Sequence, residues 1–217
     1  PLSGPHAYYG AFSSILVINR GVHEPLEEFV FQELLPRMPD APTMLELGAY
    51  WGHYSMWLKS VRANASVHLV EPELENLSAG RHNFALNGFD GNFIHASVGN
   101  GHFGVDAFLA EAKIRKLDVL HCDIQGYELE MLADCRRSLG ARSIDYLFIS
   151  THSEELHQEV PRRLEDFDYR IEVSSDFATE TTSFDGFVFA SSRSTKPVFE
   201  GFIPMGRVEI EEAQPAW

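Results

Sequence analysis

The sequence predicts an α/β protein whose mostly parallel β-sheet has helices on both faces and ends in an antiparallel strand pair. Short apolar runs alternate with amphipathic stretches between residues 43 and 165. Such alternation is typical of right-handed βαβ units, whose strands pair in parallel. Two further apolar runs, 169–173 and 185–190, are separated by a Thr/Ser-rich loop without helical spacing. They therefore predict a terminal antiparallel hairpin.

Each expected element follows from the spacing of its apolar residues. Residues 14–19 predict a short strand, and residues 23–38 predict a helix that ends near Pro36 and Pro39 and precedes the core. The expected core strands span residues 43–47, 66–71, 92–97, 117–122 and 144–150. The expected core helices span residues 53–62, 73–87, 104–112, 126–138 and 153–165.

The chain divides into three expected parts. These are a cap segment with one helix at residues 1–41, a core at residues 42–190, and a loosely structured acidic tail at residues 191–217. The 217 residues fit one domain. A hydrophobic content of 44% is enough for a core that needs no stabilisation by disulfides or a metal. The chain begins at Pro1 rather than Met, which leaves a start further upstream open.

Charge and composition narrow the possible partners. The formal charge of −15 repels a phosphate backbone, and no Lys/Arg run offers a local exception. No apolar run approaches the roughly 18 residues that a membrane span needs. Cys122 and Cys135 lack CxxC spacing, so we interpret them as reduced thiols of a cytoplasmic protein. We expect a small-molecule or glycan partner, no nucleic acid and no membrane, while the sequence leaves the oligomeric state open.

Residues 44–55 combine an apolar strand, a Gly-x-x-x-Gly turn and the start of a helix. Gly48 and Gly52 allow the backbone to approach a ligand, and the amides at the start of the helix favour a carboxylate. S-adenosylmethionine has such a carboxylate, whereas a dinucleotide would require the absent G-x-G-x-x-G spacing. The turn therefore favours an S-adenosylmethionine site, and a purely structural tight βα turn is the alternative.

Two acidic residues lie at the same expected edge of the sheet. Glu71 ends the second core strand, where a carboxylate can accept hydrogen bonds from both ribose hydroxyls of a nucleotide. Capping of the helix that begins near Glu73 is the alternative role. Glu46 lies inside the first core strand, where a charge is costly unless it is paired. We expect Glu46 either to hold the turn or to reach the ammonium group of the cofactor.

Aromatic side chains crowd the glycine turn. Tyr50, Trp51 and Tyr54 follow Gly48 within six positions. Aromatic faces attract a sulfonium cation, although packing in the core explains any one of these residues equally well.

A third motif predicts the acceptor side of the site. Asp123 ends the fourth core strand and His152 follows the fifth, so both should reach the ligand-binding edge of the sheet. We expect His152 to remove a proton from a substrate hydroxyl and Asp123 to orient it. The alternative for Asp123 is a helix N-cap, and the alternative for His152 is a surface histidine before a helix. Asp123, His152 and Glu154 are also candidate ligands for a divalent metal such as Mg²⁺.

Together these motifs resemble the FkbM family of S-adenosylmethionine-dependent methyltransferases. The resemblance spans about residues 21–190. The family pattern acidic-x-Gly-Ala-x-x-Gly-x-Tyr-Ser matches residues 46–55, and its Glu-Pro with a following Asn-x-x-x-Asn-Gly matches residues 71–72 and 83–88. Its Asp-x-Glu-Gly-x-Glu signature appears at residues 123–128, with Gln125 where family members commonly carry Glu.

The resemblance implies a class I, Rossmann-like methyltransferase fold with seven strands in the order 3-2-1-4-5-7-6. It also implies that Glu71 binds the ribose and that Asp123 borders the acceptor pocket. Family members commonly carry Asn-Ile where this chain has Tyr50-Trp51, so the rim of the cofactor site is altered. The residues expected to bind the cofactor are Glu46, Gly48, Ala49, Tyr50, Gly52, Tyr54, Glu71, Pro72, His95, Ala96 and Asp123.

These observations predict an S-adenosylmethionine-dependent O-methyltransferase that acts on a hydroxyl of a sugar, glycan or natural product. Its expected catalytic residues are His152 and Asp123. A methyltransferase-like binding module without turnover, as part of a larger polypeptide, is the alternative. A nicotinamide-dependent oxidoreductase is disfavoured by the missing G-x-G-x-x-G and by the terminal hairpin.

Overall fold

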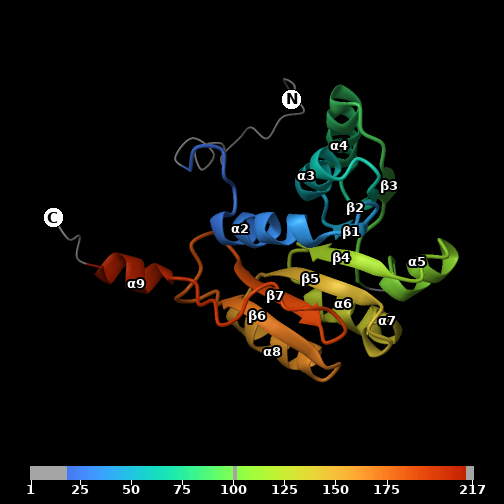
Figure 1. Ribbon diagram of the computed structural model, residues 1–217. Coiled ribbons are helices and arrows are strands. Elements are labelled where there is room, and N and C mark those ends of the chain that lie inside the picture. The colour runs from blue at the N-terminus through green and yellow to red at the C-terminus, as the bar shows by residue number, and fades with distance from the viewer. Residues whose placement is uncertain (1–18, 100–101, 214–217) are drawn as a thin grey trace.

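A computed structural model describes residues 19–99 and 102–213 of the chain. The strand expected at residues 14–19 lies outside the described residues, apart from Asn19. A single seven-stranded sheet crosses the molecule in the order β3-β2-β1-β4-β5-β7-β6 (Figure 1). This is the order that the resemblance implied, and it is that of class I methyltransferases.

The strands agree closely with their predicted positions. Strands β1 to β5 pair in parallel, and β7 pairs antiparallel with both β5 and β6, which confirms the terminal hairpin. In chain order the strands are β1 Thr43–Leu47, β2 Ser66–Glu71, β3 Asn92–His95, β4 Leu117–Cys122, β5 Ile144–Thr151, β6 Tyr169–Ser175 and β7 Gly186–Ser192.

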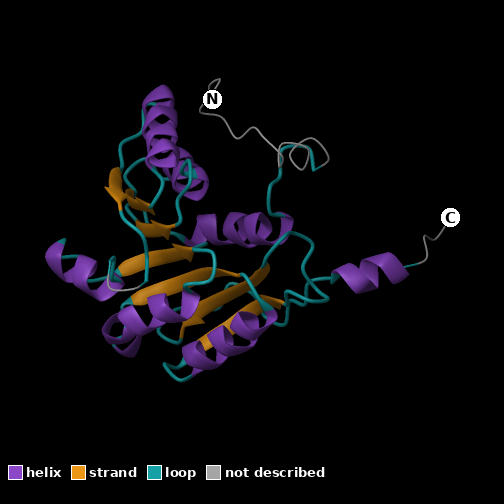
Figure 2. Ribbon diagram, turned by 180° about the vertical axis from the view of Figure 1, so that it is seen from behind, coloured by secondary structure: helices purple, strands orange, loops and turns teal. Residues whose placement is uncertain are grey.

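Helices cover both faces of the sheet (Figure 2). A 3₁₀ helix at Leu35–Arg37 continues α2. The α-helices are α2 Pro25–Leu34, α3 His53–Val61, α4 Leu74–Asn87, α5 Val105–Glu111, α6 Glu128–Asp134, α7 Arg136–Gly140, α8 Glu154–Glu165 and α9 Arg207–Glu212. Among the described residues, every helix falls short of the length and apolar character that a membrane crossing requires.

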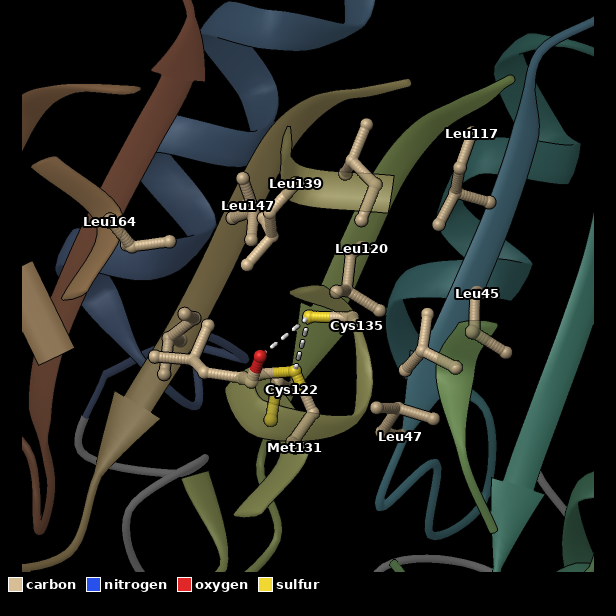
Figure 3. Close-up of a cluster of buried hydrophobic side chains, with 14 of the residues drawn as sticks. Leu45, Leu47, Leu117, Leu120, Cys122, Met131, Cys135, Leu139, Leu147 and Leu164 are labelled. Atoms are coloured by element: carbon tan, nitrogen blue, oxygen red, sulfur yellow. Dashed lines mark hydrogen bonds between the residues drawn. The ribbon is translucent and has the colours of Figure 1, made fainter. Parts of the chain in front are cut away.

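The helix predicted at residues 126–138 is divided in two. Cys135 adopts φ −113° and ψ 18°, which departs from helical geometry and separates α6 from α7. Its thiol lies 3.8 Å from the Met131 sulfur and 3.6 Å from the Leu132 carbonyl oxygen, inside the apolar cluster drawn in Figure 3. Cys122 and Cys135 are both buried and unpaired, in agreement with the predicted reduced thiols.

Two apolar cores flank the sheet. One packs α5, α6, α7 and α8 against the face that carries Leu45 and Leu120. The other packs α2, α3 and α4 against the opposite face. In this second core the Phe31 ring of α2 lies 5.1 Å from the Tyr54 ring and 5.5 Å from the Phe148 ring, centroid to centroid. Helix α2 is therefore anchored on the sheet over β5.

The structure departs from the expected loosely structured tail at the end of β7 and at α9. Strand β7 continues to Ser192 because its pairing with β5 reaches Ser191. The backbone amides of Val198 and Phe199 then donate to the Glu172 carboxylate at 2.6 and 2.8 Å. Helix α9 follows and projects away from the body of the molecule (Figure 1).

Candidate active site

A cavity of about 660 Å³ opens at the carboxyl ends of β1 and β4. Its floor and walls come from the glycine turn after β1, the residues after β4, the segment before α2 and the loop before β7. Ligands of open α/β sheets bind at this edge, and the volume suits a small-molecule site. The lining residues are Asn19, His23, Glu24, Glu46, Gly48, Ala49, Tyr50, Trp51, His53, Tyr54, His121, Asp123, Gln125, Thr182, Ser183, Phe184 and Asp185.

The glycine turn is held in left-handed backbone geometry. Gly48 has φ 72° and Gly52 has φ 82°, values that favour glycine. The Gly48 and Ala49 amides donate to the Val70 carbonyl oxygen at 2.9 and 3.0 Å. A β-carbon on Gly52 would lie 2.9 Å from the side chains of Leu69 and Phe84, so this glycine also permits close packing under the turn.

Glu46 is the buried carboxylate at the floor of the cavity. Burial raises the pKa of its carboxyl group, although the neighbouring His121 and Ser55 oppose that shift. One carboxylate oxygen accepts from the Ser55 amide at 3.1 Å, in the first turn of α3. Glu46 therefore holds the start of α3 under the glycine turn, as one of its two predicted roles requires, while its side chain still lines the cavity.

Glu71 lies beside the cavity rather than in its lining. One carboxylate oxygen accepts from the Tyr50 amide at 2.9 Å, and the other accepts from the Glu73 amide at 3.0 Å and the Asn76 side chain at 3.1 Å. The carboxylate thus ties the glycine turn to the start of α4. The hydrogen bonds to Glu73 and Asn76 support the alternative role predicted for Glu71, which is to cap the start of this helix.

Four other residues predicted at the cofactor site also lie outside the lining. The His95 imidazole lies 2.9 Å from the Pro72 carbonyl oxygen, so the ends of β2 and β3 come together as predicted. Gly52 belongs to the glycine turn itself, and the other three lie at the ends of β2 and β3. The four are Gly52, Pro72, His95 and Ala96.

Asp123 and His152 meet as the sequence predicts. The His152 Nε2 lies 3.1 Å from the Asp123 carboxylate and 2.7 Å from the terminal amide group of Gln125, which must turn its oxygen toward Nε2 when the imidazole is protonated. The His152 Nδ1 lies 2.7 Å from the carboxylate of Glu128, which is fully buried. Burial opposes the charged imidazolium, but hydrogen bonds to Asp123 and Glu128 raise the pKa of His152 to about 10. His152 is therefore a cation at neutral pH.

The predicted third metal ligand does not join this pair. The Glu154 carboxylate accepts from the Ala178 amide at 3.2 Å and from the Gln158 side chain at 3.1 Å. Asp185 takes its place, since one ligand atom each from Asp123, His152 and Asp185 lies within 4.8 Å of the others. No sequence motif surrounds Asp185, which lies in the cavity at the end of the loop that precedes β7.

The segment just before α2 forms a wall of the cavity that the sequence did not predict, and α2 packs behind it. The Tyr54 hydroxyl lies 3.1 Å from the Glu24 carboxylate. One Glu27 oxygen lies 2.5 Å from the His121 Nε2, and the other accepts from the Ser150 hydroxyl at 3.1 Å. Burial raises the pKa of Glu24 and raises that of Glu27 to about 8. Glu24, just before the cap helix, therefore lines the cavity, and Glu27 of the helix contacts the lining residue His121 from behind.

The two departures from the family pattern share an unusual backbone geometry. Tyr50 has φ 47° and Gln125 has φ 55°, in the left-handed region that Asn and Gly occupy more readily. Both residues line the cavity. Tyr50 therefore places a larger side chain than the common Asn on left-handed backbone, whereas Gln125 differs from the common Glu in charge and not in size.

The family model described as Methyltransferase FkbM domain matches residues 102–171. The resemblance to the FkbM family is confirmed over these residues. The matched segment runs from the approach to α5 through β6 and includes Asp123, Gln125 and His152. The match does not include the glycine turn, so it rests on the part of the site around Asp123 and His152. No curated protein matches the sequence.

Solved structures similar to this FkbM-like chain share its fold at low identity. A precorrin-6y C5,15-methyltransferase from Geobacter metallireducens GS-15 has a TM-score of 0.55 at 14% identity, covering 77% of this chain and 88% of that one. TrmK of M. capricolum, in complex with S-adenosylhomocysteine, has a TM-score of 0.53 at 11% identity, with 80% and 72% covered. A SAM-dependent methyltransferase from Aquifex aeolicus has a TM-score of 0.50 at 16% identity, with 74% and 88% covered. The fold is that of class I methyltransferases.

Proposed function

We propose that this chain is an S-adenosylmethionine-dependent methyltransferase that modifies a hydroxyl group of a sugar, glycan or natural product. One observation carries the proposal: a single cavity joins the glycine turn after β1 to Asp123 after β4. The first element suits the methyl donor and the second borders the place for an acceptor. Donor and acceptor can then meet within one enclosed space, as direct methyl transfer requires.

The residues around the turn fit the donor. Gly48 and Gly52 bring the backbone close to the ligand, and the start of α3 offers amides to a carboxylate. The Glu46 carboxylate suits an ammonium group, and Tyr54 brings an aromatic side chain to the same cavity. The bound donor supplies an activated methyl group on a sulfonium. If Glu71 binds the ribose, its carboxylate must accept from the ribose hydroxyls while it also accepts from the Tyr50 and Glu73 amides.

We propose His152 as the group that accepts the proton of the acceptor hydroxyl. Its position beside Asp123 favours this role, whereas its raised pKa leaves only about one molecule in a thousand neutral at pH 7. The transfer rate should consequently rise with pH up to about 10. If the methyl-transfer rate of His152→Ala stays within a few-fold of that of the parent at every pH, His152 does not accept this proton.

A resident Mg²⁺ fits the cluster poorly. Mg²⁺ prefers oxygen ligands, and the His152 Nε2 that faces Asp123 and Asp185 carries a proton at neutral pH. The imidazolium already supplies positive charge where the metal would lie. We therefore assign the reaction no metal-dependent step.

The acceptor is proposed to be a small molecule rather than RNA. One similar structure, Sp1610 of Streptococcus pneumoniae, is described as a putative tRNA methyltransferase and has a TM-score of 0.53 at 15% identity. The formal charge of −15 of this chain and the carboxylates in its cavity oppose a polyanionic acceptor.

A binding module without turnover is the second candidate. The strained Tyr50 and Gln125 at the opening favour it, because both differ from the common family pattern. Two measurements separate the candidates: calorimetry with S-adenosylhomocysteine, and methyl transfer from radiolabelled S-adenosylmethionine to a panel of hydroxylated small molecules. Binding together with transfer supports the enzyme. Binding without transfer to any acceptor supports the module, and no saturable heat with S-adenosylhomocysteine contradicts the enzyme and indicates a degenerate cleft.

A further inference from the structure

The β6–β7 loop, residues 176–185, forms one wall of the cavity. Residues 182–185 line the cavity directly. Thr181 ties them to the first half of the loop, because its hydroxyl donates to the Asp185 carbonyl oxygen at 2.5 Å and its amide donates to the Asp176 carbonyl oxygen at 2.9 Å. A displacement of the first half of the loop must therefore move this wall of the cavity.

The first half of the β6–β7 loop is held from outside by helix α9. The Arg207 amide donates to the Glu180 carbonyl oxygen at 3.0 Å, and the Val208 amide donates to the Thr179 carbonyl oxygen at 3.2 Å. The Arg207 guanidinium donates to the Ala178 carbonyl oxygen. The first amides of a helix have no partner within the helix, so α9 is free to offer them to the loop. Three successive carbonyl groups of the loop are thus held by the first turn of α9.

The chain between β7 and α9 also holds the helix behind another wall of the cavity. The Phe29 ring of α2 lies 6.0 Å from the Phe199 ring and 5.5 Å from the Phe202 ring, centroid to centroid. Glu24, which lines the cavity, directly precedes α2. One continuous stretch, residues 198–208, therefore contacts the supports of two separate walls.

Helix α9 is attached to the β6–β7 loop by hydrogen bonds and not by burial. Each residue of the helix is exposed, and Ile203 and Met205 just before it are 85% and 63% exposed. Among the described residues, the hydrogen bonds that link α9 to the rest of the chain all end on residues 178–180. An element with few buried contacts opens at a much lower free-energy cost than the core does. The attachment of α9, which projects from the body of the molecule in Figure 1, is therefore reversible.

We propose that α9 is a latch on the cavity. While its first turn holds residues 178–180, the β6–β7 loop keeps its wall in place and a bound cofactor is retained. When α9 detaches, the loop moves and the cofactor exchanges with solvent, as loop motions permit in other enzymes. This inference rests on the proposed function, because it concerns how the same site takes up and releases its ligand. Arg207 and Val208 are then positioning residues, which act on the ligand only through residues 182–185.

An engineered disulfide can close the latch. A β-carbon built on Gly206 would lie 3.5 Å from the β-carbon of Glu180, at the lower end of the range found across disulfides. The double variant Glu180→Cys/Gly206→Cys of the full chain should therefore form a cross-link on mild oxidation, which mass spectrometry verifies. Cys122 and Cys135 are buried, so they stay out of the thiol exchange. The dissociation rate of S-adenosylhomocysteine is followed by stopped-flow tryptophan fluorescence, because Trp51 lines the cavity.

We expect oxidation of the double variant to slow the dissociation of S-adenosylhomocysteine about tenfold. Reduction with dithiothreitol should return the rate to that of the Glu180→Cys variant. The single variants Glu180→Cys and Gly206→Cys, treated in the same way, serve as controls and should not respond to oxidation. Equal rates in the cross-linked and the reduced double variant would overturn the proposal.

A second variant opens the latch. Arg207→Pro removes both hydrogen bonds that Arg207 donates to the loop, while proline suits the first position of a helix and the extended backbone of Gly206 before it. We expect S-adenosylhomocysteine to dissociate about tenfold faster and the Thr181 amide to exchange its hydrogen faster. Val208→Ala keeps every backbone amide and is the matched control. A dissociation rate in Arg207→Pro equal to that in Val208→Ala, or faster release without faster exchange at Thr181, would contradict the latch.

Failure of the proposed function is a separate outcome. If the parent chain shows no saturable heat with S-adenosylhomocysteine, the methyltransferase proposal itself fails, whatever the state of α9. If that heat is present and the dissociation rate is independent of α9, the latch alone is wrong.

Discussion

A β-carbon placed on Gly48 would lie 1.7 Å from the carbonyl oxygen of Asp123. The first residue after β1 therefore packs directly on the first residue after β4, and the contact joins the glycine turn to the part of the cavity around Asp123. The Asp123 amide also donates to the Leu47 carbonyl oxygen at 3.0 Å, which continues the pairing of the two strands to this point.

Gly48→Ala should therefore separate the two halves of the site. We expect a loss of about 3 kcal/mol or more in the free energy of unfolding, because the overlap involves rigid backbone, together with loss of S-adenosylhomocysteine binding. Urea unfolding and calorimetry measure the two effects. Gly88→Ala is the matched control: Gly88 has φ 69°, but a β-carbon there would meet nothing within 4 Å. That variant should lose about 1 to 2 kcal/mol and keep full binding. Equal losses in both variants would contradict the role given to the contact.

Replacing Tyr50 with a residue that tolerates left-handed backbone geometry should stabilise the chain. At φ 47°, Asn is more favourable than other residues with a side chain. We expect the free energy of unfolding of Tyr50→Asn, measured with urea, to be about 0.5 to 1 kcal/mol higher than that of Tyr50→Ala. The same pair of substitutions at Phe184, which lacks a positive φ, should show no such difference. A similar gain at both positions would mean that polarity, not backbone geometry, is responsible.

The sequence predicts the fold and part of the site because these depend on local patterns. The bounds of β1, β2 and β4 are those expected, since each is a compact apolar run between turns. The meeting of Asp123 with His152 follows from the rule that parallel strands end at one edge. Glu24 and Asp185 were missed for the opposite reason. They reach the cavity through the docking of α2 and the course of a polar loop, and neither has a signature in the spacing of residues.

Metal removal should have no effect on the site. Because the protonated His152 repels a cation, we expect the thermal unfolding temperature and the affinity for S-adenosylhomocysteine to be equal in Mg²⁺ and in EDTA at matched ionic strength. Differential scanning fluorimetry and calorimetry measure them. A rise of several degrees with Mg²⁺ that Asp185→Asn abolishes would instead identify Asp123, His152 and Asp185 as a metal site.

Glu27 should make the stability of the chain fall as pH rises from about 4.5 to about 8. Burial is the main cause that raises the pKa of its carboxyl group from 4.5 to about 8. Within this window the folded chain holds a proton that the unfolded chain has released, so the free energy of unfolding decreases with increasing pH by up to about 1.4 kcal/mol per unit. Below the window both states hold the proton, and above it neither does.

Glu27→Gln removes this titration while keeping a side chain of similar shape between His121 and Ser150. Relative to the parent, the variant should therefore gain stability steadily between pH 4.5 and 8 in urea unfolding, and its advantage should level off above pH 8. Glu155→Gln, at an exposed position of α8, should give a difference curve without that slope. A flat curve for Glu27→Gln would show that this carboxyl group is ionised in the folded chain, and that His121 is then the protonated partner of the pair.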